Sequence, residues 1–197
     1  ENEKEIIEQE EVSIEKQEPK GPIIICVDTS GSMHGAPERI AKTVTFALAK
    51  IAMNEKRSCY LISFSTGIET LDLSSFKGVD ALLKLVQFLR MSFNGGTDAA
   101  PALTHAVEQL QTNEWKNADV LMVSDFVMGG LPSGLEEEIK SEQEKETGFY
   151  SLVIGSDGNK QTLEVFNENW NYNPVNPAAQ KELVRQLDTL RRRKTKN

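Results

Sequence analysis

Three short polar segments of this sequence carry side chains that could bind a metal ion. They read Asp-Thr-Ser-Gly-Ser at 28–32, Gly-Gly-Thr-Asp at 95–98 and Ser-Asp-Phe at 124–126. Hydroxyl and carboxylate oxygens are the ligands that hard divalent cations prefer. We therefore predict a site for Mg²⁺, with Mn²⁺ as the alternative ion. The candidate ligands are Asp28, Ser30, Ser32, Thr97 and Asp125.

Two of these segments directly follow apolar runs, at 22–27 and 120–123. Short apolar runs that end in polar residues are typical of buried parallel strands. In open α/β sheets, ligand sites form at the edge where the carboxyl ends of the strands meet. We therefore expect the three polar segments to converge at that edge.

The elements that must position these segments alternate between strands and helices. This alternation predicts the α/β fold class, with a doubly wound, mostly parallel sheet flanked by helices. The segment 68–73 alternates in polarity after a turn at 65–67, as an edge strand does. The other expected strands are 22–28, 59–64, 120–123, 149–154 and 169–172. Two expected helices begin near Pro37 and near Asp98, and three more span 79–91, 135–147 and 178–193. Gly148 is the expected C-terminal cap of the helix at 135–147.

The length of 197 residues predicts one domain, which we place at 21–193. Residues 1–20 hold eight Glu and three Lys, and we interpret them as an acidic linker or the end of a preceding helical region. Residues 194–197 form a basic tail. Because the sequence begins with Glu, we expect it to belong to a longer protein. The formal net charge of −8 argues against nucleic-acid binding.

The sequence has no apolar run of membrane-spanning length and no secretory signal pattern. Its two cysteines, Cys26 and Cys59, lie in strand-like apolar segments. We expect buried free thiols, which suit a reducing cytosol, and a disulfide is the alternative. The expected localisation is therefore cytoplasmic.

The spacing of the five candidate ligands resembles the von Willebrand factor type A (VWA) domain family and its metal-ion-dependent adhesion site. In that family an Asp-x-Ser-x-Ser loop, a distant Thr and a later Asp form the ion site. Here these positions fall on Asp28, Ser30, Ser32, Thr97 and Asp125. The resemblance implies a Rossmann-like fold in which the three hydroxyls bind the ion directly. It also implies that the two carboxylates act mainly through water and that an acidic partner residue completes the site.

A narrower resemblance is to the C-terminal domain of the bacterial ViaA family. It is carried by Gly-Pro-Ile-Ile at 21–24, Phe-Asn-Gly-Gly-Thr-Asp at 93–98 and Ser-Asp-Phe at 124–126. ViaA proteins are partners of RavA, an AAA+ ATPase of the MoxR type. The resemblance therefore implies an adaptor or regulator that docks an acidic residue of such an ATPase on bound Mg²⁺.

Two other functions are the alternatives. An extracellular adhesion-type VWA domain would bind a matrix or surface protein. A metal-dependent hydrolase is less favoured, because the sequence has only two histidines, His34 and His105, and no phosphate-binding glycine loop follows the first strand. We expect both histidines at the surface, no catalytic residue and no enzymatic activity.

Apolar residues next to the polar segments have two possible roles. Met33 follows the first segment, and Phe126, Val127 and Met128 follow Asp125. They either form an apolar rim for a partner beside the ion or pack inward.

Overall fold

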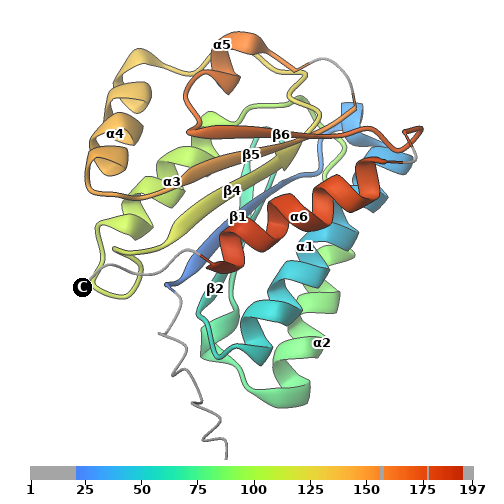
Figure 1. The fold of residues 1–197 in the computed structure, drawn as a ribbon, viewed down its shortest axis with the longest axis vertical. Helices are drawn as coiled ribbons and strands as arrows, with labels where there is room; N and C mark the ends of the chain where they lie inside the picture. The colour runs from blue at the N-terminus through green and yellow to red at the C-terminus, as the bar shows by residue number, and fades with distance from the viewer. Residues whose placement is uncertain (1–20, 156–157, 177, 193–197) are drawn as a thin grey trace, which may run out of the picture.

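The computed structural model describes residues 21–155, 158–176 and 178–192 (Figure 1). Six strands form one sheet in the order β3-β2-β1-β4-β5-β6. Only β3 is antiparallel to its neighbour, so the predicted doubly wound, mostly parallel sheet is confirmed. The predicted linker at 1–20 and tail at 194–197 lie outside the described residues. The strands are β1 Ile23–Asp28, β2 Cys59–Phe64, β3 Ile68–Asp72, β4 Asp119–Ser124, β5 Phe149–Ile154 and β6 Glu168–Tyr172.

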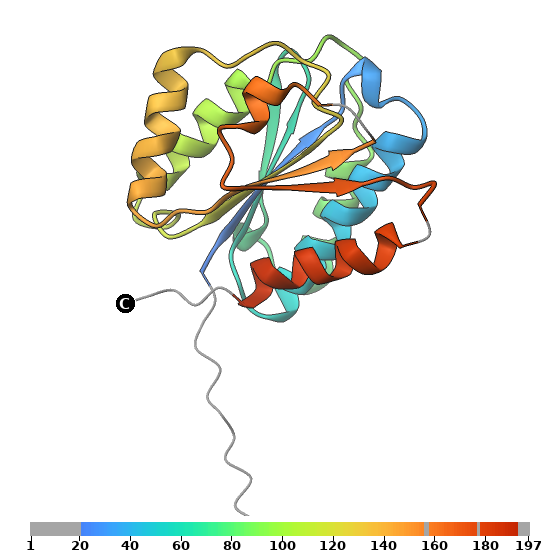
Figure 2. The same ribbon diagram turned by 45° about the horizontal axis from the view of Figure 1, so that its top comes forward.

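Helices cover both faces of the sheet. Figure 2 shows α1, α2 and α6 on one face and α3, α4 and α5 on the other. None of the helices within the described ranges combines the length and apolarity that crossing a membrane requires. The helices are α1 Ala36–Asn54, α2 Gly78–Leu89, α3 Ala100–Leu110, α4 Ser133–Glu144, α5 Lys160–Leu163 and α6 Ala179–Arg192, with 3₁₀ turns η1 Gly31–Met33 and η2 Leu73–Ser75.

The central strand β1 is buried on both faces, which explains its unbroken apolar sequence. Ile25 packs into the core under α1, whereas Cys26 packs into the core under α3. Cys59 belongs to the first of these cores, so the two cysteines face opposite sides of the sheet and are free thiols, as predicted. Burial raises the pKa of both thiols to about 12, so both stay protonated at neutral pH.

The end of α4 differs from the prediction. The helix stops at Glu144, and Glu146 adopts the left-handed conformation, with φ of 70°, that we expected at Gly148. Gly148 instead donates its backbone N–H to Asp119 Oδ1 at 3.1 Å, at the point where β5 joins β4. The helix thus ends before Gly148, whose backbone N–H is bound to the sheet.

A buried arginine, Arg57, joins the beginning and the end of the domain. Its Nη1 donates to the Leu190 carbonyl of α6 at 3.1 Å, and its Nη2 donates to the Pro22 carbonyl at 3.5 Å. Its Nε donates to the Gly21 carbonyl, and Nη2 lies 4.0 Å from Asp119 Oδ2 at the start of β4. Burial lowers the pKa of Arg57, whereas the charge of Asp119 raises it. This one side chain therefore connects the starts of β1 and β4 to the end of α6.

Candidate metal centre

The sheet places two of the polar segments side by side. The strand order changes direction between β1 and β4, and ligands bind outside the carboxyl ends of strands at such a switch point. Val27 pairs with Val123 in the parallel register, so Asp28 and Ser124, the next residue of each strand, are neighbours. Asp125 follows directly.

Asp28 is fully buried, and both of its carboxylate oxygens accept hydrogen bonds. Oδ1 accepts the backbone N–H of Ser30 at 2.8 Å, and Oδ2 accepts the hydroxyl of Ser124 at 2.5 Å. Burial raises the pKa of Asp28, the hydrogen bonds from Ser124 and Ser30 lower it, and the charge of Asp125 raises it further. The net pKa is above its usual value, so the ionised carboxylate lacks full compensation by the protein alone. A cation beside Asp28 would supply that compensation.

The hydroxyls of Ser30 and Ser32 lie beside each other, with 3.2 Å between their Oγ atoms. Ser30 is buried and Ser32 is exposed, so the pair leads from the carboxylate to the solvent. Cis ligands of an octahedral Mg²⁺ with bonds of about 2.0–2.1 Å lie about 2.9 Å apart. The spacing of the two hydroxyls is within a few tenths of an ångström of that geometry.

Backbone hydrogen bonds hold the loop of Thr97 against the site. Gly31 donates its N–H to the Gly95 carbonyl at 2.8 Å, and a Cβ on Gly31 would lie 3.3 Å from that oxygen. Asn94 donates to the Thr29 carbonyl at 3.3 Å, and Asp98 donates to the Ser65 carbonyl at 2.8 Å. The half-buried Thr97 is therefore carried by a loop that is hydrogen-bonded to the segments directly after β1 and β2.

Asp125 is half-buried, and its backbone contacts a methionine side chain. Its backbone N–H donates to Met33 Sδ at 3.2 Å, and its Oδ1 accepts the N–H of Val127 at 3.0 Å. Met33 and Phe126 are fully buried, so these two residues pack inward. Val127 is exposed beside Asp125, and Phe93 is exposed on the Thr97 loop. Met128 is half-buried against the core under α3, so the exposed large apolar residues next to the candidate ligands are Val127 and Phe93.

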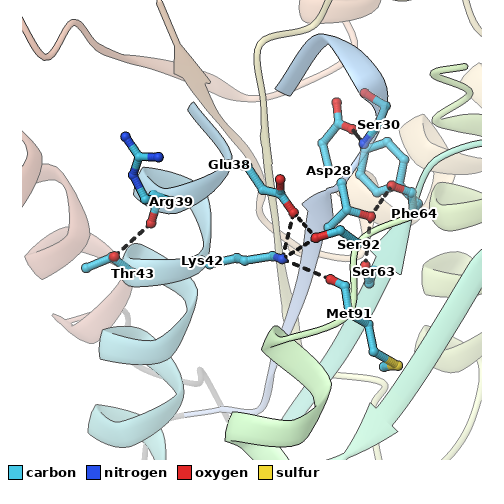
Figure 3. A network of polar contacts seen from close by, with 11 residues as sticks. Asp28, Ser30, Glu38, Arg39, Lys42, Thr43, Ser63, Phe64, Met91 and Ser92 are labelled. Atoms are coloured by element: carbon cyan, nitrogen blue, oxygen red, sulfur yellow. Dashed lines mark hydrogen bonds and ion pairs between the residues drawn. The ribbon is translucent and has the colours of Figure 1, made fainter. Parts of the chain in front are cut away.

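A cluster of three polar side chains joins α1 to the Thr97 loop (Figure 3). Lys42 Nζ lies 2.6 Å from Glu38 Oε1 and donates to the Met91 carbonyl at 2.9 Å and to Ser92 Oγ at 2.8 Å. The Ser92 hydroxyl in turn donates to Glu38. Burial raises the pKa of Glu38, but the hydrogen bonds from Lys42 and Ser92 outweigh it and hold the pKa below its usual value. The cluster therefore fixes the start of a loop that contains no regular secondary structure.

We predict that Lys42→Met loosens this loop. Hydrogen exchange of the amides at 91–98 should become faster, because the variant loses the contacts of Lys42 to Met91 and Ser92. If the loop supplies a metal ligand, Mg²⁺ affinity should fall by about threefold to tenfold. Lys50→Met, at an exposed lysine two turns further along α1, is the control. Unchanged exchange at 91–98 in Lys42→Met would contradict a positioning role for Lys42.

Sequence reasoning did not find every residue of this region. Ser124 and Met33 contact Asp28 and Asp125, respectively, but neither was a candidate ligand. Ser124 could be found from its place at the end of a strand, given the strand order. His34 is exposed as expected. The prediction for His105 is wrong, because this residue is half-buried against β2 and its Nε2 lies 3.0 Å from the hydroxyl of Tyr60.

The chemistry of the site favours a hard cation. No group of three or more His, Cys, Asp or Glu side chains suited to a metal occurs in the part of the chain that the structure describes. The candidate donors at the strand ends are two carboxylates and three hydroxyls, which suit Mg²⁺ or Mn²⁺ rather than a thiolate or imidazole metal. The residues present therefore fit the predicted ion.

The structure is thus an open, doubly wound α/β domain with polar side chains at its switch point. A family model described as the von Willebrand factor type A domain matches residues 23–128, and the chain belongs to this family. The predicted family membership is confirmed.

The chain is similar to two curated proteins described as regulatory protein ViaA. The protein from Proteus mirabilis is 39% identical over 160 residues, covering 81% of this chain and 32% of the relative. The protein from Photorhabdus laumondii is 38% identical over 159 residues, covering 80% of this chain and 32% of the relative. The chain thus spans about a third of the length of the curated relatives it matches.

Solved structures share the fold. Proximal thread matrix protein 1 from the mussel byssus, in a structure described as having a zinc occupied MIDAS motif, superimposes with a TM-score of 0.67. The identity is 18%, over 88% of this chain and 47% of that chain. At this identity the likeness shows the fold alone.

Proposed function

We propose that this domain is a metal-dependent protein-binding module that docks an acidic residue of a protein partner on a bound Mg²⁺. Ser30, Ser32 and Thr97 bind the ion directly, and Asp28 and Asp125 hold it mainly through water. The module acts as an adaptor or regulator of a MoxR-type AAA+ ATPase of the RavA kind.

The observation that carries this proposal is the pairing of a buried Asp28 with two hydroxyls that lead to the solvent. Neutral hydroxyl ligands leave most of the positive charge on an ion, and Mg²⁺ exchanges waters at its remaining positions. A carboxylate that arrives from solvent is attracted to such an ion. The exposed Val127 and Phe93 beside the site supply apolar area for a partner surface.

The similar proteins favour binding over catalysis. The chain is 38–39% identical to two proteins described as regulatory. The ATPase as partner comes from the resemblance to the ViaA family.

The test is the affinity of the chain for a RavA-type ATPase from the same cell, measured by calorimetry with Mg²⁺ and with EDTA. We expect EDTA or Ser30→Ala to raise the Kd at least tenfold, which is about 1.4 kcal/mol. Ser141→Ala, at an exposed serine of α4, is the matched control and should bind like the wild type. A Kd that changes neither with EDTA nor with Ser30→Ala would reject the metal-bridged mode.

A further inference from the structure

Helix α2 presents a line of aliphatic side chains to the solvent. Val79, Leu83 and Val86 are 73%, 55% and 41% exposed. Their spacing of four and three residues places them on one side of the helix. A line of three large aliphatic residues on one helix face forms a continuous patch, which single exposed residues do not.

This exposed side lies opposite the side that enters the core. Ala81, Leu85 and Phe88 are buried, and at 100° per residue they fall about half a turn away from the exposed line. A helix that only covers a core carries polar residues on its outer side. Figure 1 shows α2 at the outside of the molecule, beside α1. The outer line is therefore not explained by packing within the domain.

The line continues toward the candidate metal centre. Arg90 extends it by one turn, and the exposed Met91 and Phe93 follow in the loop that carries Thr97. We call Val79, Leu83, Val86, Met91 and Phe93 the α2 stripe. Its last member lies four residues from a candidate ligand, so one partner could cover the stripe and the ion together.

The charges around the α2 stripe have the opposite sign to those of the whole chain. Within 77–93, Lys77, Lys84 and Arg90 are opposed only by Asp80, whereas the whole chain has a net charge of −8. A partner surface that complements this region is apolar with carboxylates at its sides. A second copy of the chain meeting it across a two-fold axis would place the three cations against the same three cations.

We propose that the α2 stripe is a second docking surface for the partner of the metal centre, and that it receives an amphipathic helix with acidic flanks. This inference rests on the proposed function. Aliphatic residues at i, i+4 and i+7 on α2 fit the same spacing on a partner helix. Lys84, on one side of the aliphatic line, and Arg90, at its C-terminal end, pair with carboxylates of that helix.

The test compares Leu83→Ser/Val86→Ser with Val184→Ser, a control at a valine of α6 that is 65% exposed. The probe is the RavA-type ATPase in the presence of Mg²⁺. We expect the double variant to raise the Kd about tenfold or more, since two aliphatic contacts are lost, and the control to leave the Kd unchanged. Stabilisation by Mg²⁺ should stay as in the wild type, because neither residue belongs to the metal centre. Lys84→Glu/Arg90→Glu should weaken binding most at low salt.

The outcomes separate the two proposals. If Ser30→Ala loses binding and Leu83→Ser/Val86→Ser keeps it, the second docking surface is rejected and the metal-bridged mode stands. The reverse result supports the α2 stripe and rejects the metal bridge. If the wild type sediments as a dimer and the double variant as a monomer, the α2 stripe is an interface with a second copy. That result would overturn the inference. Absence of wild-type binding would reject both.

Discussion

The variant Asp28→Asn is expected to lose binding of divalent cations while its metal-free form keeps or exceeds the stability of the wild type. Asp28 is the fully buried carboxylate among the candidate ligands. Loss of its charge should weaken Mg²⁺ binding more than a hundredfold, which is about 2.7 kcal/mol.

The stability of the metal-free variant follows from the raised pKa of Asp28, whose first cause is burial. Because the folded pKa lies above the unfolded one, the folded domain loses stability as the pH rises from the unfolded pKa through the folded pKa. A neutral amide removes this penalty. Asn can also keep the geometry, because its oxygen can accept from Ser30 and its NH₂ can donate to the Ser124 hydroxyl.

Thermal unfolding with and without Mg²⁺ at pH 7 measures both effects. We expect Mg²⁺ to raise the Tm of the wild type and to leave the Tm of Asp28→Asn unchanged. Asp80→Asn, at an exposed carboxylate of α2, is the control and should respond to Mg²⁺ like the wild type. A metal-free Asp28→Asn domain several degrees less stable than the wild type would show that Asp28 has a structural role instead.

Of the substitutions proposed for this domain, Arg57→Ala should lower the free energy of unfolding most. Arg57→Ala leaves the carbonyls of Gly21, Pro22 and Leu190 without this donor and removes the cation beside Asp119. Loss of one partner from a buried ionic and hydrogen-bonded cluster costs about 3 kcal/mol or more. For a domain of this size that corresponds to a fall in Tm of roughly 6–12 °C.

Urea denaturation at pH 7 measures the effect of Arg57→Ala, and Arg39→Ala, at an exposed arginine of α1, is the control. The control should change the free energy of unfolding by less than about 0.5 kcal/mol. Arg57→Met preserves most of the apolar stem and should lose nearly as much stability as Arg57→Ala, because the hydrogen bonds dominate. Full stability in Arg57→Met would assign the role of Arg57 to packing.

The sequence alone predicted the fold class, because strand and helix periodicity is local. The apolar run before Asp28 and the alternation at 68–73 identified a central and an edge strand, and the structure has both. The oxygen-donor chemistry was also predictable, since it depends only on residue types. Placement of the donors at the ends of strands needed no more than the general rule for open α/β sheets.

Only the tertiary structure decided which residues meet. The contact of Ser124 with Asp28 depends on β1 lying beside β4, and residues 96 positions apart carry no local signal for that pairing. The backbone N–H of Gly148 binds Asp119 of a neighbouring strand, and the left-handed residue is Glu146 instead of Gly148. The exposed aliphatic line of α2 could be recognised only from the structure, because only the structure shows which side of the helix packs against the core. Each of these features depends on contacts between distant segments, which the order of the residues does not encode locally.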